Sequence, residues 1–251
     1  MALASAAVLL LIALRLDWQV LMHSRSRLLL VLSTTLGFTL AARLAQGVNT
    51  SGALAGAAVA FVVANRNLLM FWILLIVFAV TLAATRAGAA RKLTLQVAER
   101  KSGRSASQVM ANLGIAMLIL AIPTLSLAYV MALAAMAELT ADTLSSEIGA
   151  GYSEKTFLIT NWKAVPAGTD GGISLTGTAA GLLGAIIVAA CAGASGLIQW
   201  HGSIVIASAG AAGMLADSML GATLERRGYL NNDLVNLFGT ASAAALAWVL
   251  Q

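Results

Sequence analysis

Carboxylate side chains recur inside long apolar stretches in the C-terminal half of the chain. Glu138, Asp142 and Ser146 follow one another at intervals of four, which places them on one face of a helix. An ionisable group inside a membrane helix costs about 2.5–3.5 kcal/mol, so acids at such positions indicate a function. Glu147 lies about 140° around that helix from Asp142, so either the helix ends near Ser146 or Glu147 serves another partner.

Two further polar groups have the donor chemistry of a magnesium site. Asp217 and Ser218 lie in a stretch with glycines four residues to either side of the acid, so the carboxylate faces a close helix contact or a cavity. Asp233 suits the first turn of a final helix, and Asn236 lies further in. Mg²⁺ takes such oxygen ligands together with phosphate oxygens, although Asp217 could instead hydrogen-bond a neighbouring helix. The predicted metal ligands are a subset of Asp142, Glu147, Asp217 and Asp233.

A glycine-rich loop, within residues 161–177, leads into the apolar stretch that begins after Ser174. Backbone N–H groups clustered at a helix N-terminus bind phosphate. Because no Gly-Lys-Ser/Thr follows, the loop is not a Walker A motif, and a plain turn with an N-cap at Ser174 is the alternative. The predicted nucleotide-binding residues of this loop are Lys163, Gly168, Thr169, Gly171 and Gly172.

The excess positive charge is confined to one segment. The chain has 15 Lys+Arg and 10 Asp+Glu, a net charge of +5, and residues 86–104 hold six of the basic residues and one acid. Such a segment orients a membrane protein, and it can also hold phosphate. Asn112, in the apolar stretch that follows, requires a polar partner. The further predicted substrate-binding residues are Arg86, Lys92, Asn112, Ser146, Ser218 and Asn236. The predicted catalytic residues are Lys101, Arg104, Asp142 and Asp217.

Membrane helices must position these groups. Of 251 residues 60% are hydrophobic and 10% charged, and the mean hydropathy is +0.90, which argues against a soluble fold. We predict an all-α integral membrane bundle of eight or nine helices, forming a single domain over 1–251. The first helix is expected to be retained rather than cleaved as a signal peptide. The expected spans are 2–16, 28–45, 67–85, 106–122, 125–144, 175–193, 202–224 and 233–250, with a shorter helix at 52–65.

The short stretch at 52–65 decides the topology, because it either crosses the membrane or enters and leaves on one side. Residues 86–104 are expected to be cytoplasmic, and alternation then places 145–174 and 225–232 on the same face. If 52–65 crosses, Arg25 and Arg27 lie on the opposite face.

Other chemistries lack support: Cys191 is the single cysteine and the chain has two histidines, which disfavours disulfide, thiolate and zinc sites.

Three polar loops on one face, several carboxylates and a basic segment predict a site that joins a nucleotide or diphosphate to a membrane lipid. Residues 84–245 resemble the membrane family that includes the plant phytyl-phosphate kinases and the animal transmembrane protein 19 group. The motifs that carry this resemblance are Thr85-Arg86-x-Gly88-x3-Lys92, Gly103-Arg104-x3-Gln108-Val109-x-Ala111-Asn112, Asp142-Thr143-x-Ser145-Ser146-Glu147-Ile148-Gly149, Val165-Pro166-x-Gly168-Thr169-x-Gly171-Gly172-x-Ser174, Asp217-Ser218-x-Leu220-Gly221-Ala222 and Asn232-Asp233-x-Val235-Asn236.

The resemblance implies transfer of the γ-phosphate of a nucleoside triphosphate, CTP in the first instance, to an isoprenoid monophosphate such as phytyl or geranylgeranyl phosphate, with Mg²⁺. The expected partners are therefore a membrane lipid and a nucleotide, not a nucleic acid. The expected location is a bacterial cytoplasmic membrane, with the active face toward the cytoplasm. The alternatives are a polyprenol kinase, a lipid-phosphate nucleotidyltransferase, and a transporter or flippase that uses the buried acids for ion coupling.

Overall fold

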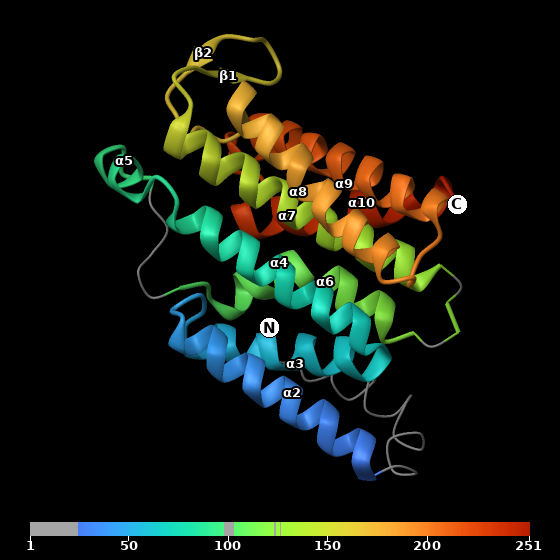
Figure 1. The fold of residues 1–251 in the computed structure, drawn as a ribbon. Coiled ribbons are helices and arrows are strands. Elements are labelled where there is room, and N and C mark those ends of the chain that lie inside the picture. Colours follow the sequence, from blue (N-terminus) through green and yellow to red (C-terminus); the bar gives the residue numbers. More distant parts are fainter. Residues whose placement is uncertain (1–24, 98–102, 123, 126) are drawn as a thin grey trace.

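The chain forms an all-α bundle of long helices (Figure 1). The computed structural model describes residues 25–97, 103–122, 124–125 and 127–251. The predicted helix at 2–16 lies outside these ranges. Within the described ranges the helices are α2 (Arg25–Leu44), α3 (Thr50–Arg66), α4 (Leu68–Arg86), α5 (Ala89–Thr94), α6 (Ala106–Leu120), α7 (Ala128–Tyr152), α8 (Leu175–Ala194), α9 (Trp200–Leu220), the π-helical turn η1 (Gly221–Glu225) and α10 (Asn232–Val249).

The predicted spans and the observed helices agree closely. Four helical segments among the described residues are both long and apolar enough to cross a membrane: α2, α4, α8, and α9 continued through η1. α7 continues to Tyr152, beyond the predicted end at 144, so Ser146 and Glu147 are helical. Several helix starts are fixed by side chains that accept a hydrogen bond from the first turn. These N-caps are Asn49 of α3, Asn67 of α4, Ser105 of α6, Ser174 of α8 and Asn231 of α10.

α3, which contains the uncertain stretch 52–65, runs the full length of the bundle. At its N-terminal end the backbone N–H of Asn49 donates to the Arg104 carbonyl over 3.0 Å. At its C-terminal end the Arg27 guanidinium, in the first turn of α2, donates to the Asn65 carbonyl over 2.8 Å. The two ends of α3 therefore lie at opposite ends of the bundle, which is the arrangement expected of a helix that crosses, although α3 is not among the four helical segments long and apolar enough to span a membrane. The first turn of α2 consequently lies at the end opposite to the basic segment.

α7 is the central helix, with 16 of its 25 residues buried, and it packs against α4, α6, α8, α9 and α10. Small residues on its neighbours allow this close approach. A Cβ atom added at Gly184 of α8 would lie 3.1 Å from the Thr140 carbonyl oxygen, and one at Gly210 of α9 would lie 2.7 Å from the Ala137 Cβ. α8 and α9 are thereby held firmly against the helix that bears the first acidic motif.

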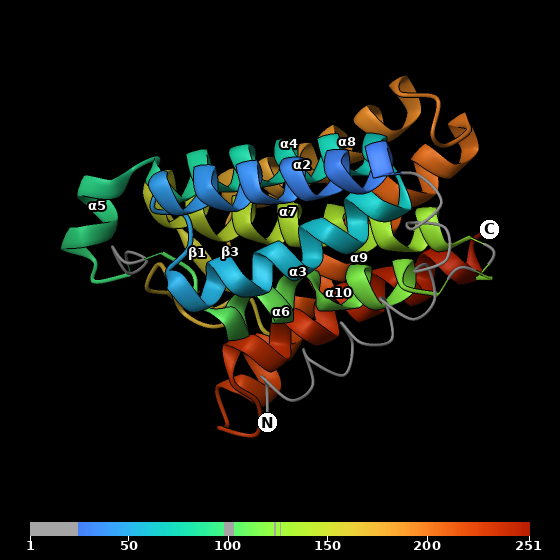
Figure 2. The same ribbon diagram turned by 90° about the horizontal axis from the view of Figure 1, so that it is seen from below.

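The loop after α7 folds into a small antiparallel sheet that the sequence analysis did not predict. Its strands are β1 (Thr156–Leu158), β2 (Ala164–Val165) and β3 (Gly172–Ile173), in the order β2-β1-β3. The register pairs Phe157 with both Ala164 and Ile173. Figures 1 and 2 show the sheet and α5 at the same end of the bundle. Because β3 ends two residues before α8, this sheet positions the glycine-rich loop at that end.

Candidate functional site

One polar cavity of about 450 Å³ at this end of the bundle brings together residues from five of the sequence motifs. Its walls come from α6, α7, the glycine-rich loop, α9 with η1, and α10. The predicted site residues that line it are Arg104, Asn112, Asp142, Ser146, Glu147, Gly168, Thr169, Gly171, Gly172, Ser218, Asp217 and Asn236. Segments separated by more than a hundred residues therefore meet at a single site.

Asp142 of α7 and Asp217 of α9 provide carboxylates from two different helices. Asp217 is 9% exposed, and its Oδ2 atom has no hydrogen-bond partner among the described residues. Asp142 interacts electrostatically with Arg104 and Glu147, and Asp217 interacts with Asp142. A buried carboxylate oxygen without a partner is costly, and either a bound cation or protonation of the carboxyl group would remove that cost.

Glu138 lies one helical turn deeper than Asp142 and does not line the cavity. It is 1% exposed, and its Oε1 has no hydrogen-bond partner in the described part of the chain. A Cβ atom at Gly239 of α10 would collide with Glu138 Oε1 and would lie 3.1 Å from Asp217 Oδ2. Both carboxyl groups thus face the same glycine, and the absence of a side chain there lets α10 approach them.

Lys92 and Glu147 form an ion pair with 2.5 Å between Nζ and Oε2, in which the lysine side chain is buried and the glutamate side chain is 15% exposed. The ammonium of Lys92 also donates to the carbonyl of Thr85 over 2.5 Å and to that of Ala84 over 3.3 Å. Lys92 is 1% exposed and is not among the residues that line the polar cavity. The partner of Glu147 that the helical spacing required is therefore Lys92, and this pairing opposes the use of Glu147 as a metal ligand and of Lys92 as a direct phosphate contact.

The glycine-rich loop lies directly against η1. Gly171 has a φ of +71°, which favours glycine, and an added Cβ would collide with the backbone of Ala222. A Cβ at Gly221 would lie 2.9 Å from the backbone nitrogen of Gly171. At the end of the loop Ser174 caps α8, where its Oγ accepts from the Gly177 N–H over 3.1 Å. The N-cap alternative is therefore confirmed, and the same loop also lines the polar cavity.

α6 contributes a polar face that begins at its N-terminus. Ser105 and Gln108 form a capping box, in which each side chain accepts from the other residue's backbone N–H. The Asn112 Nδ2 donates to the Gln108 carbonyl over 2.8 Å, so the partner that the sequence required for Asn112 is a backbone group one turn earlier. This arrangement leaves Gln108 and Asn112 on the cavity wall beside Arg104.

Several predicted residues lie elsewhere. Lys163 is exposed in the connection between β1 and β2. Asp233 is in the first turn of α10, and Asn231 is the N-cap of that helix. Neither Lys163 nor Asp233 lines the polar cavity in the described part of the chain. Asp233 was predicted as a metal ligand, but it is Asn232 that lines the cavity. The guanidinium of Arg86 donates to the Ala45 carbonyl. Lys101 lies outside the described residues.

The polar cavity is also lined by two amides and two acids that the sequence analysis did not select. Gln108 lies four residues before Asn112, so helical spacing could have identified it. Asp170 lies inside the glycine-rich loop and could have been included with it. Glu225 follows Asp217 by eight residues, but its direction depends on the π-helical geometry of η1, which periodicity does not reveal. The added residues of the polar cavity are Gln108, Asp170, Glu225 and Asn232.

The donor set suits a magnesium ion that is shared with a phosphate group. In the described part of the chain no three Asp, Glu, His or Cys side chains are close enough to hold a metal ion by themselves. Mg²⁺ in phosphoryl-transfer sites is usually bound through one or two carboxylates, with substrate phosphates and water as the other ligands. Asp217, with its buried and unpartnered oxygen, and Asp142 fit that requirement.

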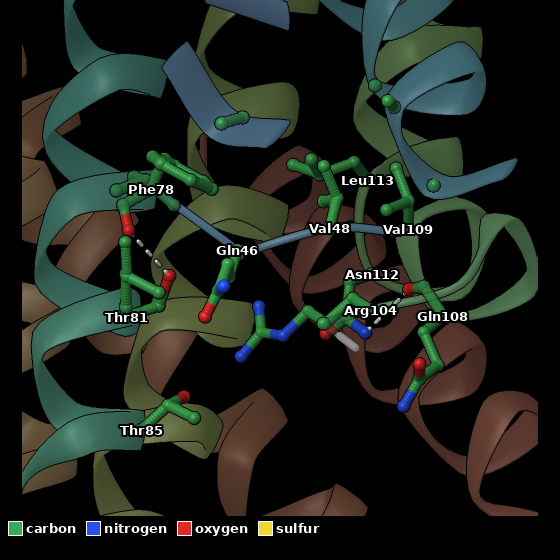
Figure 3. A pocket seen from close by; sticks show the side chains of 18 of the residues that line it. Gln46, Val48, Phe78, Thr81, Thr85, Arg104, Gln108, Val109, Asn112 and Leu113 are labelled. Carbon is green, nitrogen blue, oxygen red and sulfur yellow. Dashed lines mark hydrogen bonds between the residues drawn. The ribbon is translucent and has the colours of Figure 1, made fainter. Parts of the chain in front are cut away.

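A second, largely apolar cavity of about 320 Å³ lies between α2, α3, α4 and α6. Arg104, Gln108 and Asn112 line both cavities. Figure 3 shows the Arg104 side chain projecting into this second cavity, with the side chains of Val109 and Leu113 to one side of it. Arg86 and Lys92 also line this cavity. The two cavities therefore meet at Gln108 and Asn112 of α6 and at Arg104, which precedes this helix.

Comparison with known proteins decides the family. The family model described as "Integral membrane protein DUF92" matches residues 33–244. The chain belongs to this family. The match begins in α2 and ends at residue 244, so the family region includes the helices around the apolar cavity as well as all of the sequence motifs. The prediction of an all-α integral membrane bundle, and of this family, is confirmed.

Relatives come from archaea, cyanobacteria and plants. An uncharacterized membrane protein of Methanocaldococcus jannaschii is 43% identical over 143 residues, 55% of this chain and 58% of the relative. An uncharacterized membrane protein of Synechocystis is 34% identical over 188 residues, 70% of this chain and 72% of the relative. Protein VTE6, chloroplastic, of Arabidopsis thaliana is 38% identical over 113 residues, 44% of this chain and 34% of the relative. No solved structure matches the chain.

Proposed function

We propose that this membrane protein is a Mg²⁺-dependent prenyl-phosphate kinase. It transfers the γ-phosphate of a nucleoside triphosphate, CTP in the first instance, to an isoprenoid monophosphate. The resemblance of the motifs to those of the phytyl-phosphate kinases, and the similarity to protein VTE6 over 44% of this chain and 34% of that protein, support a link with this class of enzyme. The active end of the bundle, with the basic segment, faces the cytoplasm, where nucleotide is available.

The observation that carries the proposal is the meeting of Asp142, Asp217, Arg104 and the glycine-rich loop at one polar cavity that adjoins an apolar one. Phosphoryl transfer requires alignment of donor and acceptor and neutralisation of charge on the transferred group. The acceptor is already an oxyanion, so the site requires no strong general base. Carboxylates from α7 and α9 beside a guanidinium from the start of α6 can meet these requirements.

Each group then has a defined task. Asp142 and Asp217 would hold Mg²⁺ together with the nucleotide phosphates, and the ion would supply charge neutralisation. Backbone N–H groups of the loop that contains Gly171 bind the phosphates of the donor. Arg104, at the junction of the two cavities, holds the acceptor phosphate or the γ-phosphate through its planar guanidinium. Asn236 and Ser218 contribute neutral hydrogen bonds from the far wall.

A product assay tests the proposal. Purified protein is incubated with phytyl or geranylgeranyl phosphate, Mg²⁺ and each nucleoside triphosphate in turn. We expect the isoprenoid diphosphate and the nucleoside diphosphate in equal amounts, and loss of both when Mg²⁺ is chelated. The matched control is the free isoprenoid alcohol, which lacks the acceptor oxyanion.

Other products would overturn the proposal in specific ways. Release of pyrophosphate would indicate a lipid-phosphate nucleotidyltransferase. Phosphorylation of the free alcohol alone would indicate a polyprenol kinase with a general base such as Asp142. No turnover with any prenyl phosphate or nucleotide, combined with uptake of solute into sealed vesicles, would indicate a transporter.

A further inference from the structure

The apolar cavity between α2, α3, α4 and α6 has the form of a binding site for a hydrocarbon chain. Its volume of about 320 Å³ lies within the usual range for ligand sites, roughly 300–1,000 Å³. Each of the four helices supplies apolar side chains to it. They include Phe38 of α2, Val59 of α3, Leu74 and Phe78 of α4, and Leu113 of α6.

One end of this cavity is cationic and polar, whereas the rest is apolar. Arg86 lines it at the end of α4 and Arg104 lines it just before α6, whereas the charge of Lys92, which also lines it, is paired with Glu147. Figure 3 shows the Arg104 side chain pointing toward Gln46, with the apolar side chain of Phe78 further along the cavity. A ligand that matches this distribution has an anionic head and a long apolar tail. Because Arg104 also lines the polar cavity, the head of such a ligand would lie where the phosphates of a nucleotide could reach it.

The depth of the cavity indicates the length of the tail. Leu74 and Arg86 line its two ends along α4 and are twelve residues apart, which corresponds to about 18 Å of helix. An extended chain covers about 3.5 Å for every three bonds, so the distance of about 18 Å corresponds to about 15 bonds. Each isoprene unit adds about four bonds to the main chain, so this length corresponds to roughly four isoprene units. Leu139 of α7 lines the same cavity and helps to form its inner wall.

We propose that this cavity binds the hydrocarbon chain of the lipid monophosphate and limits it to about four isoprene units. The assignment rests on the proposed kinase function for the identity of the head group. The binding of the chain itself can be measured without turnover. Chain selection is then a property of α2, α3 and α4, whereas phosphate chemistry is a property of α6 to α10.

Gly56 of α3 offers a way to shorten the cavity. It lines the cavity about 9 Å from the start of α3, so a side chain there would project about halfway along the depth. No described atom lies within 4 Å of a Cβ added at this position, so a larger residue enters open space without a clash. Gly37 of α2 is the matched control, because a Cβ there is equally unobstructed, and Gly37 is exposed and outside the cavity lining.

The kinetic test compares Gly56→Leu, Gly56→Ala and Gly37→Leu with prenyl phosphates of one to five isoprene units. We expect Gly56→Leu to lower kcat/KM for the four-unit substrate relative to the two-unit substrate by about tenfold or more. Gly56→Ala should give a smaller shift in the same direction, and Gly37→Leu should leave the preference unchanged. Thermal unfolding of each variant checks that the fold is retained. A Gly56→Leu variant that folds and keeps the original preference would overturn the proposal.

A binding test separates this inference from the kinase proposal. A prenyl monophosphate with a photoactivatable group at the tip of a four-unit chain is crosslinked to the full chain, and the labelled residues are mapped by mass spectrometry. We expect labels near Val59, Leu74 and Leu139, reduced by Gly56→Leu but not by Gly37→Leu. Labels there without any phosphoryl transfer would overturn the kinase proposal alone. Transfer with labels only on the outer face of α2, for example at Leu29 and Leu36, would overturn the chain site alone.

Discussion

The two cavities meet at Arg104, Gln108 and Asn112, yet they are built in opposite ways. The polar cavity is assembled from a long loop and five helical segments that are distant in sequence, and its walls are carboxylates, amides and glycines. The apolar cavity is formed mainly by consecutive helices, and its walls are aliphatic and aromatic. Under the proposed function, one part of the fold would provide the phosphate chemistry and another would provide the site for a lipid chain.

The wall between the polar cavity and the apolar cavity contains one ion pair. Lys92 lines the apolar cavity, Glu147 lines the polar one, and their ion pair lies between them. Because Lys92 and Glu147 neutralise each other, neither side chain requires a charged ligand. Arg104, by contrast, lines both cavities and lies within electrostatic range of Asp142. The ion pair therefore has one member in each cavity wall, whereas Arg104 belongs to both walls.

The largest effect is expected from Asp142→Asn and from Asp217→Asn, each of which keeps the side-chain shape and removes the charge. Each variant should lower phosphoryl transfer by about a thousandfold, a typical loss when a group that stabilises transition-state charge is removed. Chain selection should be unchanged, because neither residue lines the apolar cavity. The measurement is the initial rate of diphosphate formation with substrates of two chain lengths.

Glu154→Gln is the control for these two variants. Glu154 is an exposed carboxylate at the same end of the bundle, and it is not among the described residues of either cavity. We expect its rate to match the wild type. Wild-type rates in both aspartate variants would show that the assignment of the metal ligands is wrong, even if the kinase activity itself is present.

The same comparison explains what the sequence could predict. Acids such as Asp142 and Asp217 are rare and costly in membrane helices, so their presence alone indicated a site, and the structure places both at one cavity. Glycine-rich segments and helix caps are similarly local signals, as Ser174 shows. Because these features depend on residue type and short spacing, most of the polar cavity could be predicted before the fold was known.

The apolar cavity could not be predicted in this way. Val59, Leu74 and Phe78 are ordinary residues of membrane helices, and only the packing of α3 against α4 and α6 makes them neighbours of an open space. The small sheet was missed because its strands are two or three residues long, too short for a periodic pattern. Asp233 was selected because its type and spacing suited a metal site, but the observed helix start places Asn232 on the cavity wall instead.

A second prediction concerns the ion pair in the wall between the cavities. Lys92→Met removes the ammonium that Glu147 faces and should lower the free energy of unfolding by about 1–3 kcal/mol, because the carboxylate left behind is partly exposed to the polar cavity. The double variant Lys92→Met/Glu147→Gln removes both charges and should recover most of this loss. The measurement is denaturant or thermal unfolding in detergent micelles.

The control for the ion pair is Lys155→Met, which changes an exposed lysine at the same end and should alter stability by less than about 0.5 kcal/mol. If Lys92→Met were as stable as the wild type, the wall would not depend on charge pairing. Lys92 would then be available to a substrate phosphate, and the contrast drawn with Arg104 would fail.

The smallest effect is expected where the glycine-rich loop meets η1. Gly171→Ala adds a Cβ that collides with the backbone of Ala222 and requires alanine to adopt a φ of +71°. Gly228→Ala is the matched control, because its φ is +75° and no described atom lies within 4 Å of the added Cβ. The control should lose about 1 kcal/mol from backbone strain, and Gly171→Ala should lose at least about 1 kcal/mol more.

Kinetics would show which cavity the Gly171 substitution disturbs. Displacement of the loop should raise the KM for the nucleotide while leaving the preference among prenyl chain lengths unchanged, because Gly171 lines the polar cavity and not the apolar one. Equal losses of stability in Gly171→Ala and Gly228→Ala would mean that the loop moves away from η1 freely. A change in chain preference would instead mean that the two cavities are coupled through the loop, so that phosphate binding and chain selection are not separate properties of this fold.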